Sequence, residues 1–304
     1  MPRWALAALL AWLGFAMPAH ATLDCPAPLP TDPVVANPTT AHAQGLLWKI
    51  DKAGVPSSFL YGTIHLADPA VATPSPSVLA ALHVSRRFVL EVLFDEATLA
   101  RVASSMQAAP PGNLGAAAGA ALLREAEKRL AAYGVDAASA GRLKPWAAWT
   151  TLGLPPGQES TGEPLDLRLL SLAREAGLET FGLESLEEQV AVFDATPLPA
   201  QLALLQEALC FPDIQRAELA ATVAAWQRED LAWLLALARQ SRSPSEQALT
   251  RRLLDERNAR MAGRLLPRLR DGGLFVAVGA AHLPGDDGLL AHIARAGYSV
   301  TRQR

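Results

Sequence analysis

The stretch "GGLFVAVGAAHLPG", residues 272–285, contains an unbroken run of apolar residues and glycine that ends at His282. Runs of this kind are typical of a central strand that helices cover on both faces. Residues 87–94, "RFVLEVLF", have the same character and carry one acid, Glu91. Two such strands, in a chain that also contains amphipathic helices, predict an α/β protein.

A second apolar run, "SSFLYGTIHLADP" at 57–69, ends in the same way. In both runs a glycine lies three residues before a histidine: Gly62 with His65, and Gly279 with His282. A glycine near a strand end permits a close backbone approach, and open α/β sheets bind ligands beyond the carboxyl ends of their strands. We therefore expect both imidazoles in one crevice. A single strand-end histidine is more often a turn residue or a satisfied hydrogen-bonding group.

Strand and helix patterns alternate along the rest of the chain. "LLWKID" and "SFLYGTIH", separated by "KAGVPS", predict a hairpin, and "LETFGLE" at 178–184 and the final "YSVTRQ" predict further strands. Helical periodicity dominates about 96–175 and 199–270. These patterns predict a mixed central sheet flanked by helices, with a helical insertion in the middle of the chain, in a single domain at 46–304.

Helix termini can be assigned from local signals. Ser75-Pro76 and Ser243-Pro244 predict helix starts, as does Asp230, and Gly177 predicts a helix end. Ser185 and Glu188 have the spacing of a capping box.

The first 45 residues differ from the rest. Residues 1–21 have a basic start, a short apolar core and the sequence "AHA", which predicts a signal peptide cleaved after Ala21. Residues 22–45 are rich in proline and threonine and predict an extended arm. No later stretch has the length and hydropathy of a membrane span. We expect a soluble exported protein, periplasmic in a Gram-negative source.

Cys25 and Cys210 are the two cysteines of the chain. Export would place them in an oxidising compartment, which favours a structural disulfide between the arm and the body. The alternative is two free thiols.

Composition excludes several classes of function. A net charge of −3 and 6% aromatic residues argue against a nucleic-acid platform. The arginines at 251–270 alternate with leucine and methionine at helical spacing, which favours a solvated helix face over a basic patch. No G-x-S-x-G, G-x-G-x-x-G or P-loop motif is present, so neither a serine hydrolase elbow nor a nucleotide cofactor is indicated.

Two acids are candidates for a functional site. Glu91 lies within an apolar strand, where a carboxylate is costly unless it is paired or binds a metal; the alternative is a pair with a buried arginine. Glu184 ends "FGLE" at a strand-to-helix junction, where the helix dipole alone could account for it.

Three residues on predicted helices are weaker candidates. Arg257 and Asn258 lie in "DERNARM", and an asparagine inside a helix indicates a specific hydrogen bond or a surface position. Asp166 in "PLDLRLL" could be a helix N-cap.

Two imidazoles and a carboxylate form a plausible donor set for a first-row divalent metal. Such an ion would lower the pKa of a bound water and polarise a carbonyl group. The sequence therefore predicts His65, His282 and Glu91 as metal ligands, with functional atoms roughly 3 to 6 Å apart because metal–ligand bonds are about 2 Å long.

Six ordered blocks of the chain resemble the TraB/GumN (PrgY) family. They are "LLWKID…FLYGTIHLADP", "FVLEVLFD", "LKPWAAWTTL", "PLDLRLL…AREAG…FGLESLEEQ", "ERNARMA" and "FVAVGAAHLPGDDGLLAHIARAGYSV". The family is similar to the animal Tiki metalloproteases and, more distantly, to the EreA/ChaN-like group. The resemblance implies an α/β fold with both G-x-x-H motifs in one site.

The resemblance also implies a divalent-metal hydrolase, with Mn²⁺ or Co²⁺ as the ion. It implies that His65 and His282 are ligands or catalytic residues, that Glu91 is a ligand or general base, and that Glu184, Arg257 and Asn258 support the site. One departure concerns the family's "E-L-D" pattern, because here the acid after Glu91 stands at Asp95.

Two functions follow from these features. The first is a periplasmic metal-dependent hydrolase of peptide or amide bonds, acting on a peptide or small-molecule substrate. The second is a non-catalytic periplasmic protein that binds a peptide signal, haem or metal in the same crevice.

Overall fold

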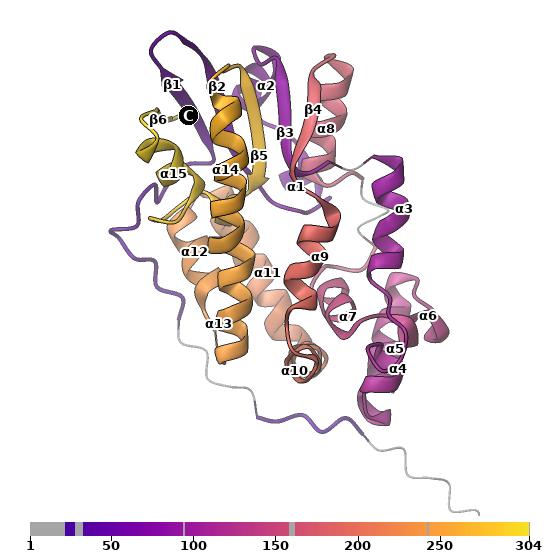
Figure 1. The fold of residues 1–304 in the computed structure, drawn as a ribbon. Coiled ribbons are helices and arrows are strands. Elements are labelled where there is room, and N and C mark those ends of the chain that lie inside the picture. Colours follow the sequence, from indigo (N-terminus) through magenta and orange to yellow (C-terminus); the bar gives the residue numbers. More distant parts are fainter. Residues whose placement is uncertain (1–21, 28–32, 94, 158–161, 242, 304) are drawn as a thin grey trace, which may run out of the picture.

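A six-stranded mixed sheet forms the centre of the protein in the computed structural model, which describes residues 22–27, 33–93, 95–157, 162–241 and 243–303 (Figure 1). The sheet order is β4-β3-β5-β2-β1-β6. The strands are β1 (Leu47–Lys52), β2 (Val55–Thr63), β3 (Arg87–Val92), β4 (Glu179–Glu184), β5 (Leu274–Gly279) and β6 (Ser299–Arg302).

Pairing within the sheet explains which strands are most apolar. β5 pairs in parallel with β2 and β3, and β3 pairs in parallel with β4. β1 pairs antiparallel with β2 and β6. The first five residues of β5 are buried, in agreement with its continuous apolar run. The predictions of an α/β fold, a mixed sheet and an opening hairpin are confirmed.

Helices cover the sheet and extend beyond the carboxyl ends of its parallel strands (Figure 1). They are α1 (Pro69–Ala72), α2 (Pro76–His83), α3 (Glu96–Ser105), α4 (Leu114–Ala117), α5 (Ala120–Leu130), α6 (Ala137–Arg142), α7 (Pro145–Leu152), α8 (Leu165–Glu175), α9 (Leu186–Asp194), α10 (Leu198–Cys210), α11 (Pro212–Gln227), α12 (Leu231–Arg239), α13 (Pro244–Arg251), α14 (Arg257–Leu269) and α15 (Leu289–Arg295). A π-helical turn, Arg252–Glu256, joins α13 to α14.

The helix termini follow the local sequence signals. Ser75 and Ser243 cap α2 and α13, each with a proline in the first turn. Ser185 and Glu188 form the predicted capping box at the start of α9. Gly177 follows α8 with a φ of 72°, a conformation that glycine adopts without the steric cost of a Cβ.

Two hydrophobic clusters hold these elements together. The larger surrounds the sheet and includes Leu60, Phe88 and Phe275, all fully buried. The smaller joins α5 and α7 to α10, around Leu130 and Leu205. The helical insertion therefore contributes a packed core of its own beside that of the sheet. The single-domain boundary at 46–304 stays a prediction.

The predicted disulfide between Cys25 and Cys210 is present and fastens the arm to the end of α10. The described part of the arm carries no helix or named strand, and reaches the body through the bridge between Gln44 and Asp230. The signal peptide predicted at 1–21 lies outside the described residues. Within the described ranges, no helix has both the length and the hydropathy needed to cross a bilayer.

Loss of this disulfide is expected to lower the free energy of unfolding by about 2–4 kcal/mol, because it closes a loop of 185 residues in the unfolded chain. Urea unfolding of the oxidised protein should be compared with that of the Cys25→Ser/Cys210→Ser double variant. Reductant should lower the unfolding midpoint of the wild type and leave the double variant unchanged. Equal midpoints for the two oxidised proteins would contradict the prediction.

Candidate functional site

The carboxyl ends of the parallel strands bring together side chains from distant parts of the sequence. β2 and β5 are neighbours, with Thr63 opposite Gly279, so the two G-x-x-H motifs leave the sheet side by side. A methyl group placed on Gly279 would lie 3.3 Å from His65 Nε2, 3.4 Å from Glu91 Oε1 and 3.6 Å from His282 Cδ2. The three predicted ligands therefore surround Gly279, which leaves them this space by having no side chain.

Gly62 allows the two motifs to pack against each other. A Cβ at position 62 would lie 3.1 Å from Ala280 Cα, closer than most real contacts of this kind. The carbonyl of Gly62 accepts a hydrogen bond of 3.1 Å from Trp226 Nε1 at the end of α11. Glycine at this position therefore lets the first motif lie against the second, and its backbone carbonyl connects the first motif to α11.

An aspartate in the first turn of α8, Asp166, holds His65 in place. Asp166 Oδ2 lies 2.9 Å from His65 Nδ1, and Asp166 Oδ1 accepts a hydrogen bond from Thr63 Oγ1. The N-cap of α8 is Pro164, and Asp166 lies within the first turn. The N-cap interpretation was therefore wrong. The contacts of Asp166 join residues 101 and 103 positions apart, so local sequence spacing could not reveal them. The available signal in the sequence was that Asp166 lies in one of the six blocks that resemble the family.

Asp166 also sets the charge of His65. Its negative charge raises the pKa of His65 to about 9, against an opposing effect of desolvation. The His65 side chain is 63% exposed, whereas that of Asp166 is 12% exposed. Contact with water therefore partly screens the pair. His65 is the member of the cluster that a ligand in solution can reach most easily.

The Asp166→Asn variant is expected to lower the pKa of His65 towards the ordinary value of 6.5, because the charge that stabilises its imidazolium is lost. The His65 proton resonances, followed by NMR across a pH titration, would measure this shift. The Asp68→Asn variant, which removes a nearby negative charge but keeps a side chain that can cap α1, is the control. An unchanged pKa of His65 in Asp166→Asn would show that the aspartate does not set its charge.

His282 is buried and lies between Asn258 and Arg257. Asn258 Nδ2 donates to the carbonyl of Asp287 at 2.9 Å, so its Oδ1 faces His282 Nδ1, 2.7 Å away. Burial, with a contribution from Arg257, lowers the pKa of His282 to about 4. A neutral imidazole in this position carries its proton on Nδ1, which leaves a lone pair on Nε2 directed at Arg257 Nη1, 3.2 Å away.

Glu91 combines the two possibilities that the sequence left open, because it lies in the cluster and also pairs with a buried arginine. Its Oε2 lies 2.5 Å from Arg257 Nη2 and 3.2 Å from Gln189 Nε2, and its Oε1 accepts a 2.7 Å hydrogen bond from Gly279 N. Burial alone would raise the pKa of Glu91, but His282, Arg257, His65 and the Gly279 N–H together outweigh it and hold the pKa below its usual range. Glu91 is therefore ionised at neutral pH.

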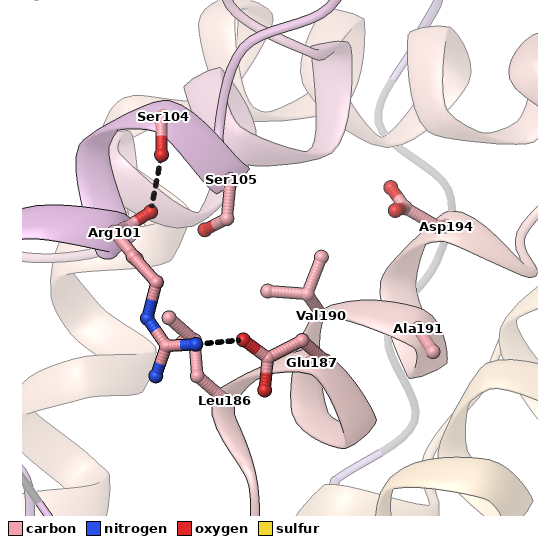
Figure 2. A pocket seen from close by; sticks show the side chains of 8 residues that line it. All are labelled: Arg101, Ser104, Ser105, Leu186, Glu187, Val190, Ala191 and Asp194. Carbon is pink, nitrogen blue, oxygen red and sulfur yellow. Dashed lines mark hydrogen bonds and ion pairs between the residues drawn. The ribbon is translucent and has the colours of Figure 1, made fainter. Parts of the chain in front are cut away.

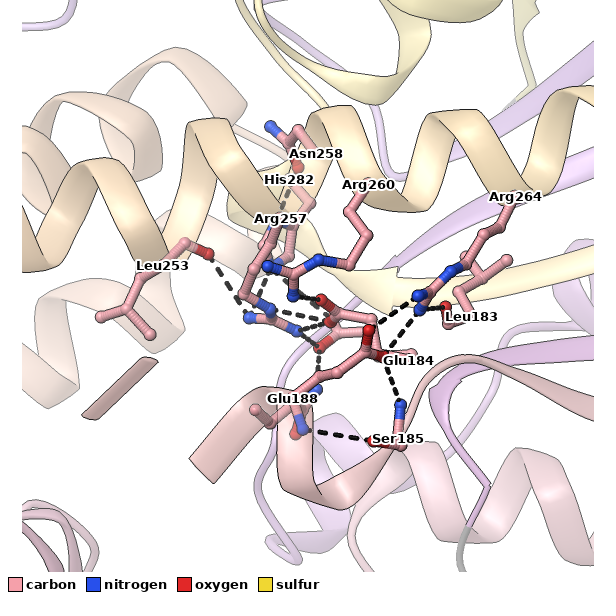
Figure 3. A network of polar contacts seen from close by, with 12 residues as sticks. Leu183, Glu184, Ser185, Glu188, Leu253, Arg257, Asn258, Arg260, Arg264 and His282 are labelled. Carbon is pink, nitrogen blue, oxygen red and sulfur yellow. Dashed lines mark hydrogen bonds and ion pairs between the residues drawn. The ribbon is translucent and has the colours of Figure 1, made fainter. Parts of the chain in front are cut away.

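Glu184 also faces arginines and lies deeper than Glu91. Its side chain is 0% exposed, and its two oxygens meet Arg257 Nε at 2.8 Å and Arg260 Nη1 at 2.9 Å (Figure 3). Arg264 forms a bidentate pair with Glu188, 2.7 Å for each contact. The interpretation of the arginines at 251–270 as a solvated face was wrong for Arg257, which is 9% exposed, whereas Arg260 and Arg264 stay partly solvated while they pair with Glu184 and Glu188.

Asp95, the acid displaced in the sequence, lies outside this cluster. Its carboxylate caps α3 by accepting a hydrogen bond from Thr98 N. Asp95 therefore serves as a structural cap of α3.

The cluster agrees with known metal sites in how its histidines are oriented, and differs from them in having an arginine among the donors. Both histidines have Nδ1 held by an oxygen, Asp166 for His65 and Asn258 for His282, which is typical of metal-ligating histidines. However, the Arg257 guanidinium contacts Glu91 and His282 Nε2, two of the three predicted donors. Two arginines already neutralise Glu91 and Glu184.

Within the described residues, no three His, Cys, Asp or Glu side chains are placed to share one ion. As arranged, the donors do not fit a divalent metal, because Arg257 already supplies the positive charge between them.

The fold and this cluster define the class of protein: an α/β protein with paired strand-end histidines and a buried glutamate–arginine network at the carboxyl edge of its sheet. The chain belongs to the TraB/PrgY/gumN family, whose model matches residues 46–302. No curated protein and no solved structure matches the chain. The similarity to Tiki proteases stays an expectation.

Proposed function

We propose that the chain is a hydrolase of peptide or amide bonds that acts at the cluster around Gly279. The observation that carries this proposal is the contrast in exposure within the cluster. The exposed His65 ring lies beside the buried Glu91 and His282, so one reachable cationic group adjoins a fixed carboxylate. Polar groups that are held in place before the substrate arrives can stabilise the charge that develops in the transition state.

Glu91 and His65 are the proposed acid–base pair. Glu91 Oε1 and His65 Nε2 both face the space next to Gly279. A water molecule in that space would pass its proton to the ionised Glu91 as its oxygen adds to the carbonyl carbon. The protonated His65 would stabilise the developing oxyanion and give its proton to the leaving nitrogen as the carbon–nitrogen bond breaks. Glu91 would then return its proton to His65, which restores the starting state.

Arg257, Asn258 and Asp166 are the proposed positioning residues. Arg257 holds Glu91, Asn258 orients His282, and Asp166 orients His65. Glu184 is a poor candidate for the proton acceptor, since its side chain is fully buried against two arginines. Arg257 is likewise a poor oxyanion donor, because its nitrogens already donate to Glu184, Glu91, His282 and the Leu253 carbonyl.

A peptide library incubated with the purified, disulfide-intact protein tests this function. Mass spectrometry should detect new termini that depend on the protein, and the His65→Ala variant should not produce them. The His83→Ala variant, which changes an exposed histidine on α2, is the matched control. Equal product from wild type and His65→Ala would refute the proposal.

The metal dependence that the resemblance implies, with Mn²⁺ or Co²⁺, is a separate proposal. No step above depends on an ion, and the position of Arg257 weighs against one. Elemental analysis of protein purified without chelator decides the matter. One equivalent of metal in the wild type and none in His65→Ala/His282→Ala would support it, and activity that survives metal removal would contradict it.

The second candidate is non-catalytic binding of a peptide signal, haem or metal. The pairing of the buried charges favours this candidate, because Glu91, Glu184 and Arg257 neutralise one another. Such a network can stabilise the fold without taking part in a reaction. Calorimetry with haem, with Mn²⁺ and with peptides would detect a stoichiometric ligand. Turnover of a peptide that stops in His65→Ala would exclude this candidate.

A further inference from the structure

Arg252, the first residue of the π-helical turn before α14, is partly buried and forms no ion pair with any described residue. A guanidinium carries five N–H donors. Arg252 uses one of its nitrogens, Nη2, which donates a 2.9 Å hydrogen bond to Thr196 Oγ1. Its Nε is shielded from solvent and has no hydrogen-bond partner in the described part of the chain. The protein itself therefore leaves most of this cation unused.

Neighbouring arginines show that this state is specific to Arg252. Four of them each pair with a carboxylate: Arg251, Arg257, Arg260 and Arg264. Carboxylates near Arg252 and near its partner Thr196 already have other cations, since Asp255 pairs with Arg239 and Asp194 with Lys144. Arg252 is therefore a cation for which the described chain supplies no counter-charge.

Stabilisation of α9 accounts for only part of this arrangement. Thr196 directly follows Ala195, the C-cap of α9. A cation at the C-terminal end of a helix interacts favourably with the helix dipole. This interaction explains the sign of the charge, but it provides no acceptor for the remaining N–H groups of Arg252. π-Helical turns inside longer helices are frequently found at functional sites.

Arg252 lies at a defined distance from the cluster around Gly279. Gln189 on α9 donates to Glu91 Oε2 at 3.2 Å, and Thr196, the partner of Arg252, comes seven positions later. Seven helical positions make two turns, so both residues lie on one face of α9, about 10 Å apart. An extended peptide covers this distance with about three residues.

We propose that Arg252 binds a carboxylate of the peptide substrate, about three residues away from the bond that is cleaved. The carboxylate oxygens would accept hydrogen bonds from Nη1 and Nη2 of the guanidinium. The substrate backbone would run along α9 from Gln189 to Thr196. The carboxylate belongs either to the C-terminus of the substrate or to an acidic side chain, which offer the same chemistry. This inference rests on the proposed peptide hydrolysis, because it orients the substrate relative to Glu91.

The hollow on the opposite side of α9 is a weaker candidate for a ligand. It has a volume of about 390 Å³ and lies between α9 and α3 (Figure 2). Its charged residues are paired within the chain, Arg101 with Glu187 and Asp194 with Lys144. No residue of the cluster around Gly279 lines it. A ligand there would find no unpaired charge and would lie away from the proposed catalytic groups.

Binding is best measured in the His65→Asn variant, so that a peptide is not consumed. Calorimetry would compare N-acetyl-Leu-Ala-Ala-Ala-Leu as the free acid, the same peptide as the amide, and N-acetyl-Leu-Ala-Ala-Ala-Glu-amide. We expect at least one of the two carboxylate peptides to bind about tenfold more tightly than the neutral amide. Adding Arg252→Met should reduce this preference to about twofold or less. Adding Arg251→Met removes the same charge from an exposed neighbour that pairs with Glu256, and should leave the preference unchanged.

The outcomes separate this inference from the proposed function. A preference that is lost in Arg252→Met and kept in Arg251→Met supports the inference, even if the wild type cleaves none of the peptides and the hydrolase proposal fails. The preferred peptide then shows whether the C-terminus or an acidic side chain is bound. Equal binding of all three peptides, no binding, or a preference lost equally in both variants overturns it. In that case wild-type cleavage of other peptides would leave the hydrolase proposal intact.

A second variant covers the case in which Arg252→Met does not show native circular dichroism. Arg252→Lys keeps the charge but lacks the planar fork of N–H groups, so the preference should fall to about threefold. An unchanged preference in Arg252→Lys would overturn the inference.

Discussion

The Arg257→Met variant is expected to lose about 3–5 kcal/mol of unfolding free energy. Arg257 is 9% exposed and is the shared partner of Glu91 and Glu184, whose side chains are 11% and 0% exposed. Methionine fills the volume but leaves two buried carboxylates facing one another with only Arg260 to compensate. An uncompensated buried charge costs far more than the ion pair contributes, which makes this loss the largest predicted here.

Urea unfolding followed by far-UV circular dichroism would measure the change. Two other arginines, one within α14 and one at its C-cap, provide a graded comparison. Arg260→Met should cost about 1 kcal/mol or less, since Arg260 is 33% exposed and Glu184 would keep Arg257. The exposed Arg270→Met should cost almost nothing.

A second substitution tests the cause of this loss. Adding Glu91→Gln to Arg257→Met should recover part of the stability, because it removes one of the unpaired charges. A loss below about 1 kcal/mol for Arg257→Met would show that the network is hydrated or rearranges.

The His65→Ala variant is expected to lose about 10²–10⁴-fold in activity with little change in stability. The His65 ring is largely exposed, so its removal leaves no cavity in the core, while the proposed oxyanion and leaving group lose their proton donor. His282→Ala should also lose activity, and it should lose stability, because the buried ring bridges Asn258 and Arg257.

Initial rates on a peptide cleaved by the wild type, with thermal unfolding of each variant, would separate these effects. His83→Ala should match the wild type in both measurements. Activity within about threefold of the wild type in His65→Ala would remove this residue from the proposed mechanism.

Local sequence patterns predicted the elements of the fold well. The continuous run at 274–281 identified β5 because a strand buried on both faces has no polar positions. Ser75, Ser185 and Ser243 identified helix starts because their hydroxyl groups accept hydrogen bonds from nearby backbone amides. These signals act over a few residues, so they can be seen without knowing the tertiary structure.

The partners of the site residues could not be predicted in the same way. Asp166 lies under His65 because α8 packs beside the end of β2, across 101 residues of sequence. The carboxylate of Glu91 meets the guanidinium of Arg257 across 166 residues. Spacing and composition do not encode these distances, which depend on helix packing and on sheet order.

The sequence by itself determined which residues would be candidates: two histidines after strands, a glutamate inside an apolar strand, and two cysteines that could pair. The tertiary structure decided how they are used. The parallel register of β2 with β5 places His65 next to Gly279 and His282. The packing of α14 across the strand ends places Arg257 against Glu91 and His282, two of the three predicted metal ligands. Burial sets this outcome, because carboxylates withdrawn from water require a positive charge and the nearest helix supplies it.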